Sequence, residues 1–507
     1  MATEGRRADH EFTAEEILNE TKWAKDKGPQ SDHPNSNGNG ARPVPPHNVY
    51  PRNDAGNAMR LADTQGDAYR YNCDAKQWHH WEAGRWNKDA KSRVEGDVLG
   101  IADDLYGELR TIDTKEEQTK HLAWARASGM DSHVRGTLRR AQSMPPFPVV
   151  ADELDADPLL LHAVNWTLEL HLDGTWTVRE HRPNDLITLS LATDYREAAT
   201  SALWTDTLAY HLPSEPVRAC LLRFAGMCLG GMEKEHVAIA NGPQKTGKST
   251  ILGGMRATMG DYGQPMDITT LLRDRNPRPG AARPDLMALL GVRLAVVSEI
   301  EENTELNAAL LKSLAGADER SGRALYKGQE PYKPTYGIII LCNDFPVLPA
   351  NDEAVWDRVL KFPFLVERPR DKRDIAKRDE IKDPRRTGPA ILWSLLCGWQ
   401  GWCQRGRQLD PPDEVRSATQ EARDALDQPG TFLRETMLFT VTGDAEDYVS
   451  VHDVRLRYDL WLGKTATQKE RERFNRALER RGARKGQRGS IDDGRQQWFG
   501  LRWQAGG

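Results

Sequence analysis

Apolar and polar positions recur with different periods along the chain, and the changes of period divide it into segments. Between residues 69 and 86 aromatic and polar residues alternate, which predicts paired strands joined by a turn. Residues 97–110 and 115–142 have helical spacing, and 166–178 is a second strand-rich stretch with its own turn signal. These segments together predict one α+β domain over residues 53–193.

A helical segment and then an alternating segment follow. From Asp194 to Glu233 the large apolar residues are spaced for helix packing, which predicts a helical collar. Three short apolar runs, HVAIAN, VRLAVVSE and TYGIIILCN, then alternate with helical stretches, a pattern typical of a parallel sheet. We expect collar and sheet to form one motor domain over residues 194–410. The charge run after Pro369, RDKRDIAKRDEIKDPRR, is interpreted as a solvated helix face.

The two ends of the chain differ from its middle in composition and in the pattern of apolar residues. Residues 28–51 are rich in Gly, Pro, Asn and Ser and nearly devoid of apolar side chains. Residues 1–52 are therefore expected to be a flexible tail and linker, with one short helix at 12–25. At the other end, residues 431–507 finish with a helical pattern and two short candidate strands, which is typical of a winged helix.

Composition and charge narrow the class of protein. The chain has 507 residues, 38% hydrophobic and 29% charged, and no apolar run approaches the ~18 residues of a membrane span. We therefore expect several domains, no membrane partner and a location in the cytoplasm. The six cysteines form no C-x-x-C pair, which argues against a disulfide framework and a thiolate zinc site. The net charge of −5 conceals a local excess of basic residues near the C-terminus.

The motif with the clearest chemistry is the loop 242–249, GPQKTGKS, which fits G-x-x-x-x-G-K-[ST] in full. Its glycines let backbone N–H groups turn around phosphates, Lys248 would reach the β and γ phosphates, and Ser249 would hold Mg²⁺. An apolar strand precedes the loop and a helix-compatible stretch follows it. The chain is therefore expected to bind ATP and Mg²⁺. The predicted nucleotide-binding residues are Gly242, Pro243, Gln244, Lys245, Thr246, Gly247, Lys248, Ser249 and Thr250.

Hydrolysis also needs an acidic residue at the end of a neighbouring strand, to complete the Mg²⁺ shell and polarise water. The run LAVVSE ends at Glu299, and Glu301 and Glu302 follow at once. We assign the role to Glu299 because it ends the apolar run directly, and leave Glu301 as the alternative. A third strand ends at Asn343, whose amide is suited to sensing the γ-phosphate.

An arginine completes the set of candidate catalytic residues. Arg358 follows Trp356-Asp357 and precedes the strand-like run VLKFPF. An arginine there can act in trans on the nucleotide of a neighbouring subunit, where it would stabilise charge in the transition state. The alternative is an ordinary surface salt bridge, which would be favoured if Arg358 were taken in isolation.

The order of loop, acid, asparagine and arginine resembles the superfamily 3 helicases, and most closely the phage and plasmid primase-helicases that include the poxvirus nucleoside triphosphatases. The resemblance is dense over 194–364 and looser back to about residue 53. It implies a multidomain α/β fold with an AAA+-like P-loop ATPase, preceded by the α+β domain and collar and followed by the winged helix. It also implies a hexameric ring that moves along single-stranded DNA, generally 3′ to 5′.

The same resemblance identifies a DNA-contacting hairpin between the acid and Asn343. In this interval Arg323, Tyr326, Lys327 and Lys333 are the candidate DNA-binding residues. Basic and aromatic side chains at a hairpin tip can follow phosphates and stack on bases. An ordinary exposed hairpin is the alternative.

Three departures from the family pattern qualify the function. Asp357 stands where many members have a second basic residue, and Thr246 stands where many have glycine or asparagine. Acidic metal ligands of a primase are absent: Asp155-Ala156-Asp157 has the letters D-x-D, but a helix or loop is favoured there. We therefore predict a phage or plasmid replicative helicase without its own primase, which acts on single-stranded and forked DNA in the bacterial cytoplasm. A separate primase or polymerase would be its partner.

Two other functions remain open. A DNA-stimulated AAA+ ATPase that loads or remodels other proteins would share every ATPase motif but would not displace a strand. An origin-recognition module would depend on the C-terminal segment, so deleting residues beyond Thr431 would abolish sequence-selective binding and leave ATPase activity. The basic residues of that segment are Lys464, Lys469, Arg471, Arg473, Arg476, Arg480, Arg481, Arg484, Lys485, Arg488, Arg495 and Arg502.

Overall fold

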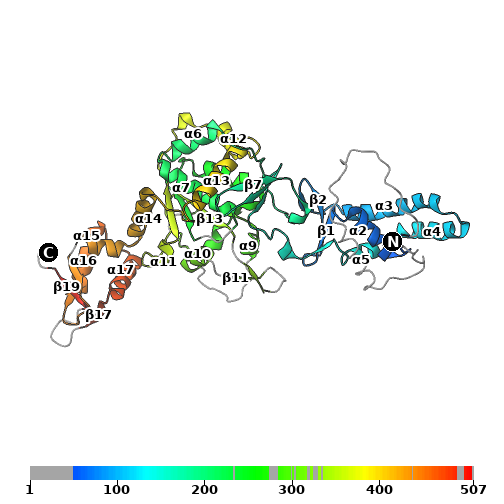
Figure 1. The fold of residues 1–507 in the computed structure, drawn as a ribbon. Helices are drawn as coiled ribbons and strands as arrows, with labels where there is room; N and C mark the ends of the chain where they lie inside the picture. The colour runs from blue at the N-terminus through cyan, green and yellow to red at the C-terminus, as the bar shows by residue number, and fades with distance from the viewer. Residues whose placement is uncertain are drawn as a thin grey trace. The chain divides into compact units, whose positions relative to one another are not determined.

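The computed structural model describes most of the chain after residue 48, and its chain divides into two compact units, Met1–Tyr195 and Arg196–Gly507 (Figure 1). The short helix expected at 12–25 lies outside the described residues. These are 49–231, 235–272, 284–298, 300–301, 304–316, 320–323, 329–332, 335–436, 438–487 and 496–504.

Among the described residues of the first unit, four α-helices and a small sheet surround one apolar core. The predicted paired strands at 69–86 are confirmed, and they join a short fourth strand in the order β3-β2-β1-β4. Leu61, Val98 and Phe147 lie in the core, each at most 1% exposed. The elements are α2 (Asp54–Gln65), β1 (Tyr69–Asn72), β2 (Gln77–Glu82), β3 (Arg85–Lys88), α3 (Arg93–Glu108), α4 (Lys115–Ser128), α5 (Asp131–Ala141) and β4 (Pro148–Val149).

A second, antiparallel sheet completes the first unit. It consists of β5 (Leu160–His162), β6 (Thr167–Leu170) and β7 (Trp176–Arg179), so the strand-rich stretch is confirmed. Asp155 lies in the loop before this sheet, where its carboxylate accepts hydrogen bonds from the backbone N–H and the hydroxyl of Thr188. The loop interpretation of Asp155-Ala156-Asp157 is therefore correct, and Asp155 holds a turn together.

The second unit is built on the predicted parallel sheet. Its strand order is β14-β8-β13-β10-β9, and every neighbouring pair is parallel. Ile239, Val297 and Ile339 are completely buried, as expected of strands covered on both faces. The strands are β8 (Val237–Asn241), β9 (Gly263–Met266), β10 (Leu294–Val297), β13 (Gly337–Cys342) and β14 (Val359–Pro363).

The helices expected for the collar are present and pack against helices from later in the chain. Gly226 of α7 and Gly398 of α13 allow their two backbones to approach closely. A Cβ at Gly226 would lie 2.3 Å from the Trp399 nitrogen, and one at Gly398 would lie 2.0 Å from the Leu222 oxygen. The principal helices are α6 (Ala202–His211), α7 (Glu215–Leu229), α8 (Lys248–Met259), α12 (Ile375–Lys382) and α13 (Gly388–Cys403).

Shorter elements connect the sheet strands. They are α9 (Pro284–Met287), α10 (Ala308–Leu314), the antiparallel pair β11 (Arg320–Arg323) and β12 (Gln329–Tyr332), and α11 (Glu353–Trp356).

The C-terminal segment has a core of its own. Phe432, Tyr458, Phe474 and Trp498 are buried together, and the rings of Tyr458 and Phe474 stack with centroids 4.2 Å apart. The predicted helical pattern followed by two strands is confirmed. Helix α14 (Asp413–Leu426) precedes this segment and packs against β14 of the parallel sheet. The elements of the segment are α15 (Gln428–Thr436), β15 (Phe439–Val441), β16 (Tyr448–Ser450), α16 (Val451–Leu462), α17 (Gln468–Arg480), β17 (Arg484–Gln487), β18 (Gln496–Phe499) and β19 (Leu501–Trp503).

Candidate nucleotide site

The G-x-x-x-x-G-K-S loop connects the carboxyl end of β8 to the first residue of α8, and two of its glycines cannot carry a side chain. Gly242 has a φ of +154°, and a Cβ there would lie 1.9 Å from the Phe364 oxygen. Gly247 has a φ of +82°, and a Cβ there would lie 2.3 Å from Cδ2 of His211. The loop therefore needs glycine at both positions to fit between the neighbouring segments.

Lys248 is turned back into the loop and is only 8% exposed. Its Nζ donates to the backbone oxygens of Gly242 (2.5 Å) and Pro243 (2.6 Å). It also donates to the Asn343 Oδ1 at 3.2 Å and to the Thr246 hydroxyl at 3.3 Å. The structure thus brings together Lys248 and Asn343, both of which the sequence assigned to the γ-phosphate.

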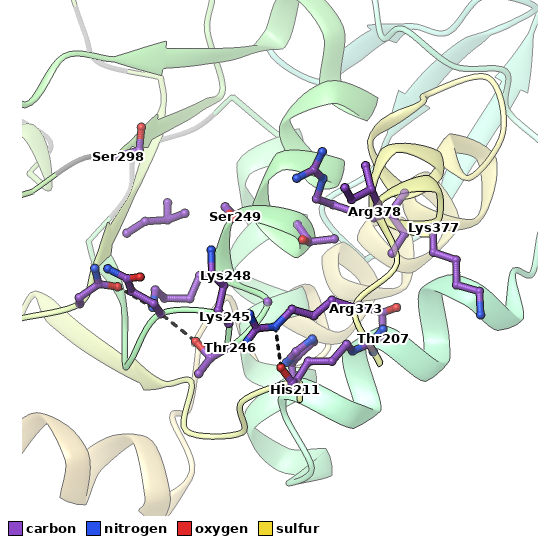
Figure 2. A pocket seen from close by; sticks show the side chains of 18 of the residues that line it. Thr207, His211, Lys245, Thr246, Lys248, Ser249, Ser298, Arg373, Lys377 and Arg378 are labelled. Atoms are coloured by element: carbon purple, nitrogen blue, oxygen red, sulfur yellow. Dashed lines mark hydrogen bonds between the residues drawn. The ribbon is translucent and has the colours of Figure 1, made fainter. Parts of the chain in front are cut away.

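A cavity of about 830 Å³ opens beside the loop (Figure 2). One side is formed by P-loop residues 244–250 together with Asn343, and by Ser298 and Ile300 beyond the end of β10. The other side is formed by Thr207 and His211 of α6 and by a basic segment at 368–378. The cavity is within the size range of small-molecule sites, and it lies beyond the carboxyl ends of the strands, where parallel sheets bind ligands.

Burial shifts the pKa of three groups that line this cavity. It lowers the pKa of the Lys248 ammonium and of the His211 ring, and it raises the pKa of the Cys342 thiol to about 11. His211 is therefore favoured as a neutral ring, whose Nδ1 lies 3.1 Å from the backbone oxygen of Val366. The Cys342 thiol stays protonated near neutral pH, so it is not a nucleophile here.

The predicted magnesium ligands are described only in part. Ser249 is exposed and lines the cavity, whereas Glu299 lies outside the described residues. Both neighbours of Glu299, Ser298 and Ile300, line the cavity. No cluster of three or more metal-binding side chains occurs among the described residues. Mg²⁺ in a phosphate site takes one or two protein oxygens with phosphate and water, so the Ser249 hydroxyl fits the ion.

Arg358 lies at the amino ends of the sheet strands, whereas the P-loop lies at their carboxyl ends. Its backbone oxygen accepts from Val237 N at 2.7 Å, at the amino end of β8, and its NH1 donates to the Ala354 oxygen at 2.8 Å. The P-loop follows the carboxyl end of the same strand, about 16 Å away for five residues of strand. Arg358 therefore does not line the cavity beside the P-loop of its own chain.

Only the backbone pairing of the two strands of the predicted DNA hairpin is described. β11 and β12 pair antiparallel from Arg320 opposite Tyr332 to Arg323 opposite Gln329, so a hairpin is present. The side chain of Arg323 and the whole of Tyr326, Lys327 and Lys333 lie outside the described residues.

Sequence reasoning missed the second side of the cavity. The run after Pro369 was interpreted as a solvated helix face, and Arg370, Arg373 and Lys377 are indeed exposed. However, the space into which these side chains are exposed is the cavity that faces the P-loop. Thr207 and His211 were also missed, because their helix was assigned only a packing role. The sequence feature that could have indicated this side of the cavity was the density of positive charge just after β14.

Comparison with known proteins finds one family match and several relatives named as helicases. A family described as "D5 N terminal like" matches residues 58–210. "Putative helicase L207/L206" of Acanthamoeba polyphaga mimivirus is 27% identical over 237 residues, which are 45% of this chain and 24% of the relative. "Putative helicase 022R" of Frog virus 3 (isolate Goorha) is 29% identical over 240 residues, 44% of this chain and 24% of the relative. Part of the chain is thus similar to a D5-type family, and both relatives are named putative helicases.

The chain spans about a quarter of the length of these relatives. Among solved structures it is similar to the apo NrS-1 C-terminal region (305–718), with a TM-score of 0.48 and 9% identity. That alignment covers 87% of this chain and 98% of the other chain. No helix in the described part of the molecule is long and apolar enough to cross a membrane.

Proposed function

We propose that this chain is an ATP-hydrolysing motor that unwinds DNA during replication of a phage or plasmid. The observation that carries the proposal is the contact of Lys248 with Asn343 inside one cavity, at the carboxyl ends of β8 and β13. A P-loop lysine and an amide that meet at one point can hold the terminal phosphate of a nucleotide from two sides. In a loop with only a structural role, neither residue would have a phosphate to hold.

Binding of ATP requires Lys248 to move from the loop's own carbonyls to the phosphates. The ammonium now satisfies the oxygens of Gly242 and Pro243, and the backbone N–H groups of the loop are the donors for phosphate. A bound Mg²⁺ would supply positive charge against the charge that develops on the phosphates. In this proposal Ser249 and Glu299 hold the ion, Glu299 polarises the attacking water, and Asn343 senses the γ-phosphate.

The position of Arg358 supports a ring. Because Arg358 lies at the amino edge of the sheet, it can serve a nucleotide only if that nucleotide belongs to another subunit. Identical subunits that contact each other head to tail form closed rings, in which each one gives an arginine and receives one. We propose a homo-hexamer, as the family resemblance implies, with ATP between subunits.

The proposed contacts to DNA come from two places. The hairpin β11–β12 would carry Arg323, Tyr326, Lys327 and Lys333 and would follow single-stranded DNA, 3′ to 5′ as the family resemblance implies. The C-terminal elements support a winged helix, because α15, α16 and α17 are followed by the strand pair β17 and β18. Its excess of basic residues suits contact with the phosphate backbone of forked DNA. A separate primase or polymerase would complete the replication apparatus.

The second candidate function is a DNA-stimulated ATPase that loads or remodels other proteins. It uses the same nucleotide site, so nothing in the cavity separates it from a helicase. The relatives named as helicases favour the motor. The two functions differ in one result, because only the motor displaces a strand from a forked substrate.

ATP hydrolysis by the full chain tests the proposal at its first step. We expect phosphate release from ATP that requires Mg²⁺ and is several-fold faster when single-stranded DNA is present. Release without Mg²⁺, or no release under any of these conditions, would contradict the assigned site.

Substitution of Lys327 tests the proposed hairpin. We expect Lys327→Ala to keep basal ATP hydrolysis and to lose most of its stimulation by single-stranded DNA, because one phosphate contact at the tip is removed. Stimulation is measured as the ratio of hydrolysis rates with and without DNA. A matched control is Lys120→Ala on the exposed surface of α4, for which the ratio should stay that of the parent. Equal stimulation in both variants would leave Lys327 as part of an ordinary hairpin.

A further inference from the structure

The nucleotide cavity has a basic side that the P-loop, Glu299 and Asn343 do not explain. It is formed by the segment between the end of β14 and the first turn of α12. Asp374 is the single acidic residue in the described lining of the cavity. The basic residues that line this side are Arg368, Arg370, Arg373, Lys377 and Arg378.

Local carboxylates neutralise only part of this charge. Asp374 caps α12, where its carboxylate accepts from the Lys377 backbone N–H at 3.1 Å. Arg378 pairs with Asp379, with its Nε and NH2 at 3.0 and 2.9 Å from Oδ1. No carboxylate among the described residues forms an ion pair with Arg373. Arg373 therefore faces the cavity with its full positive charge.

The backbone of Arg368 links the Arg373 side chain to the P-loop. The Arg373 Nε donates to the Arg368 backbone oxygen at 2.9 Å, and the Arg368 N–H donates to the Lys245 oxygen at 3.1 Å. The guanidinium of Arg368 lies over the ring of Tyr210, 4.7 Å from its centre, which holds this segment against α6. Figure 2 shows the Arg373 side chain extending toward the P-loop side of the cavity. With Nε engaged, its two terminal nitrogens remain available as a fork.

The strand order indicates which part of a nucleotide this fork faces. Asn343 and Ser298 follow β13 and β10, so the terminal phosphate belongs on that side of β8. The Arg373 segment follows β14, which lies on the other side of β8. The inner phosphates lie between these two sides, on the loop itself. We propose that Arg373 binds the α- and β-phosphates of the nucleotide held by the P-loop of the same chain.

This inference rests on the proposed nucleotide site and assigns different roles to Arg373 and Arg358. Arg373 would supply affinity for the diphosphate part within one subunit, by the planar two-point contact that guanidinium groups make with phosphate. Arg358 would supply catalysis from a neighbour. Nucleotide affinity and hydrolysis should then depend on different arginines.

Binding of fluorescent ADP to the full chain, without DNA, tests the assignment. We expect Arg373→Ala to weaken ADP binding by about 10- to 100-fold, as expected for loss of a charge-assisted contact. Arg373→Lys, which keeps the charge but not the fork, should lose about three- to tenfold. Arg385→Ala removes an exposed positive charge that lies beyond the end of α12 and outside the cavity lining, so this variant should bind ADP as the parent does. Thermal unfolding of each variant shows that the fold is retained.

The outcomes separate this inference from the proposed function. If the parent fails to bind ADP, or if Lys248→Ala binds it unchanged, the nucleotide site itself is wrong. If Lys248→Ala loses binding and Arg373→Ala keeps it, only the role of Arg373 is wrong. Equal losses for ADP, GDP and CDP support a phosphate contact. A loss confined to one base, or weaker binding of single-stranded DNA with parent-like ADP affinity, would overturn the phosphate assignment.

Discussion

Lys248→Ala should reduce ATP hydrolysis by at least about a hundred- to a thousandfold, the usual cost of removing one donor to a developing charge. Lys248 is a buried cation of the loop, and it already contacts Asn343 within the cavity. The substitution leaves the oxygens of Gly242 and Pro243 without this donor, but it also removes a charge that burial disfavours. These two effects on the free energy of unfolding oppose each other, so the variant should remain folded.

The measurement is steady-state phosphate release with saturating ATP and single-stranded DNA, accompanied by thermal unfolding. Lys120→Ala is the control, because Lys120 is exposed on α4 and pairs only with surface glutamates. Normal turnover by a folded Lys248→Ala variant would mean that the P-loop does not hold the hydrolysed nucleotide.

Arg358→Ala should reduce hydrolysis by about a thousandfold or more, the range for an arginine supplied to a phosphoryl-transfer centre. Because Arg358 lies at the edge of the sheet opposite the P-loop, its loss should leave ADP binding by the same chain unchanged. Arg416→Ala, which removes an exposed arginine from α14, is the matched control and should keep the parent's rate.

Mixing experiments distinguish a trans role from a local structural one. Arg358→Ala subunits keep an intact nucleotide site, and Glu299→Gln subunits keep an intact Arg358. In mixed rings some interfaces combine the two, so hydrolysis should recover in part at intermediate ratios. No recovery at any ratio would return Arg358 to a surface salt-bridge role.

The sequence was sufficient for features that depend on local chemistry. The P-loop glycines and the apolar run before them predicted a strand, a tight loop and a helix, which are β8, residues 242–247 and α8. The parallel sheet followed from apolar runs that are buried on both faces. The meeting of Lys248 with Asn343 could be anticipated because both follow the carboxyl ends of parallel strands.

Features that depend on tertiary contacts could not be predicted. Gly247 must be glycine partly because His211 packs against it, and nothing local in the sequence of α6 indicates this contact. The arginines after β14 have the composition of a solvated helix and remain exposed. Only the packing of α12 beside α8 turns them toward the P-loop. Glu299 and the tip of the hairpin lie outside the described residues, so their assignments stay predictions.

Strand displacement from a forked duplex by the full chain is the most direct test of the central claim. A fluorescent strand is released in real time from substrates that carry either a 3′ or a 5′ single-stranded tail. We predict release that requires ATP and Mg²⁺, occurs with the 3′ tail, and is lost with Lys248→Ala. ATP turnover that is stimulated by the same DNA, with no strand released from either substrate, would contradict the account and favour a loader or remodelling ATPase.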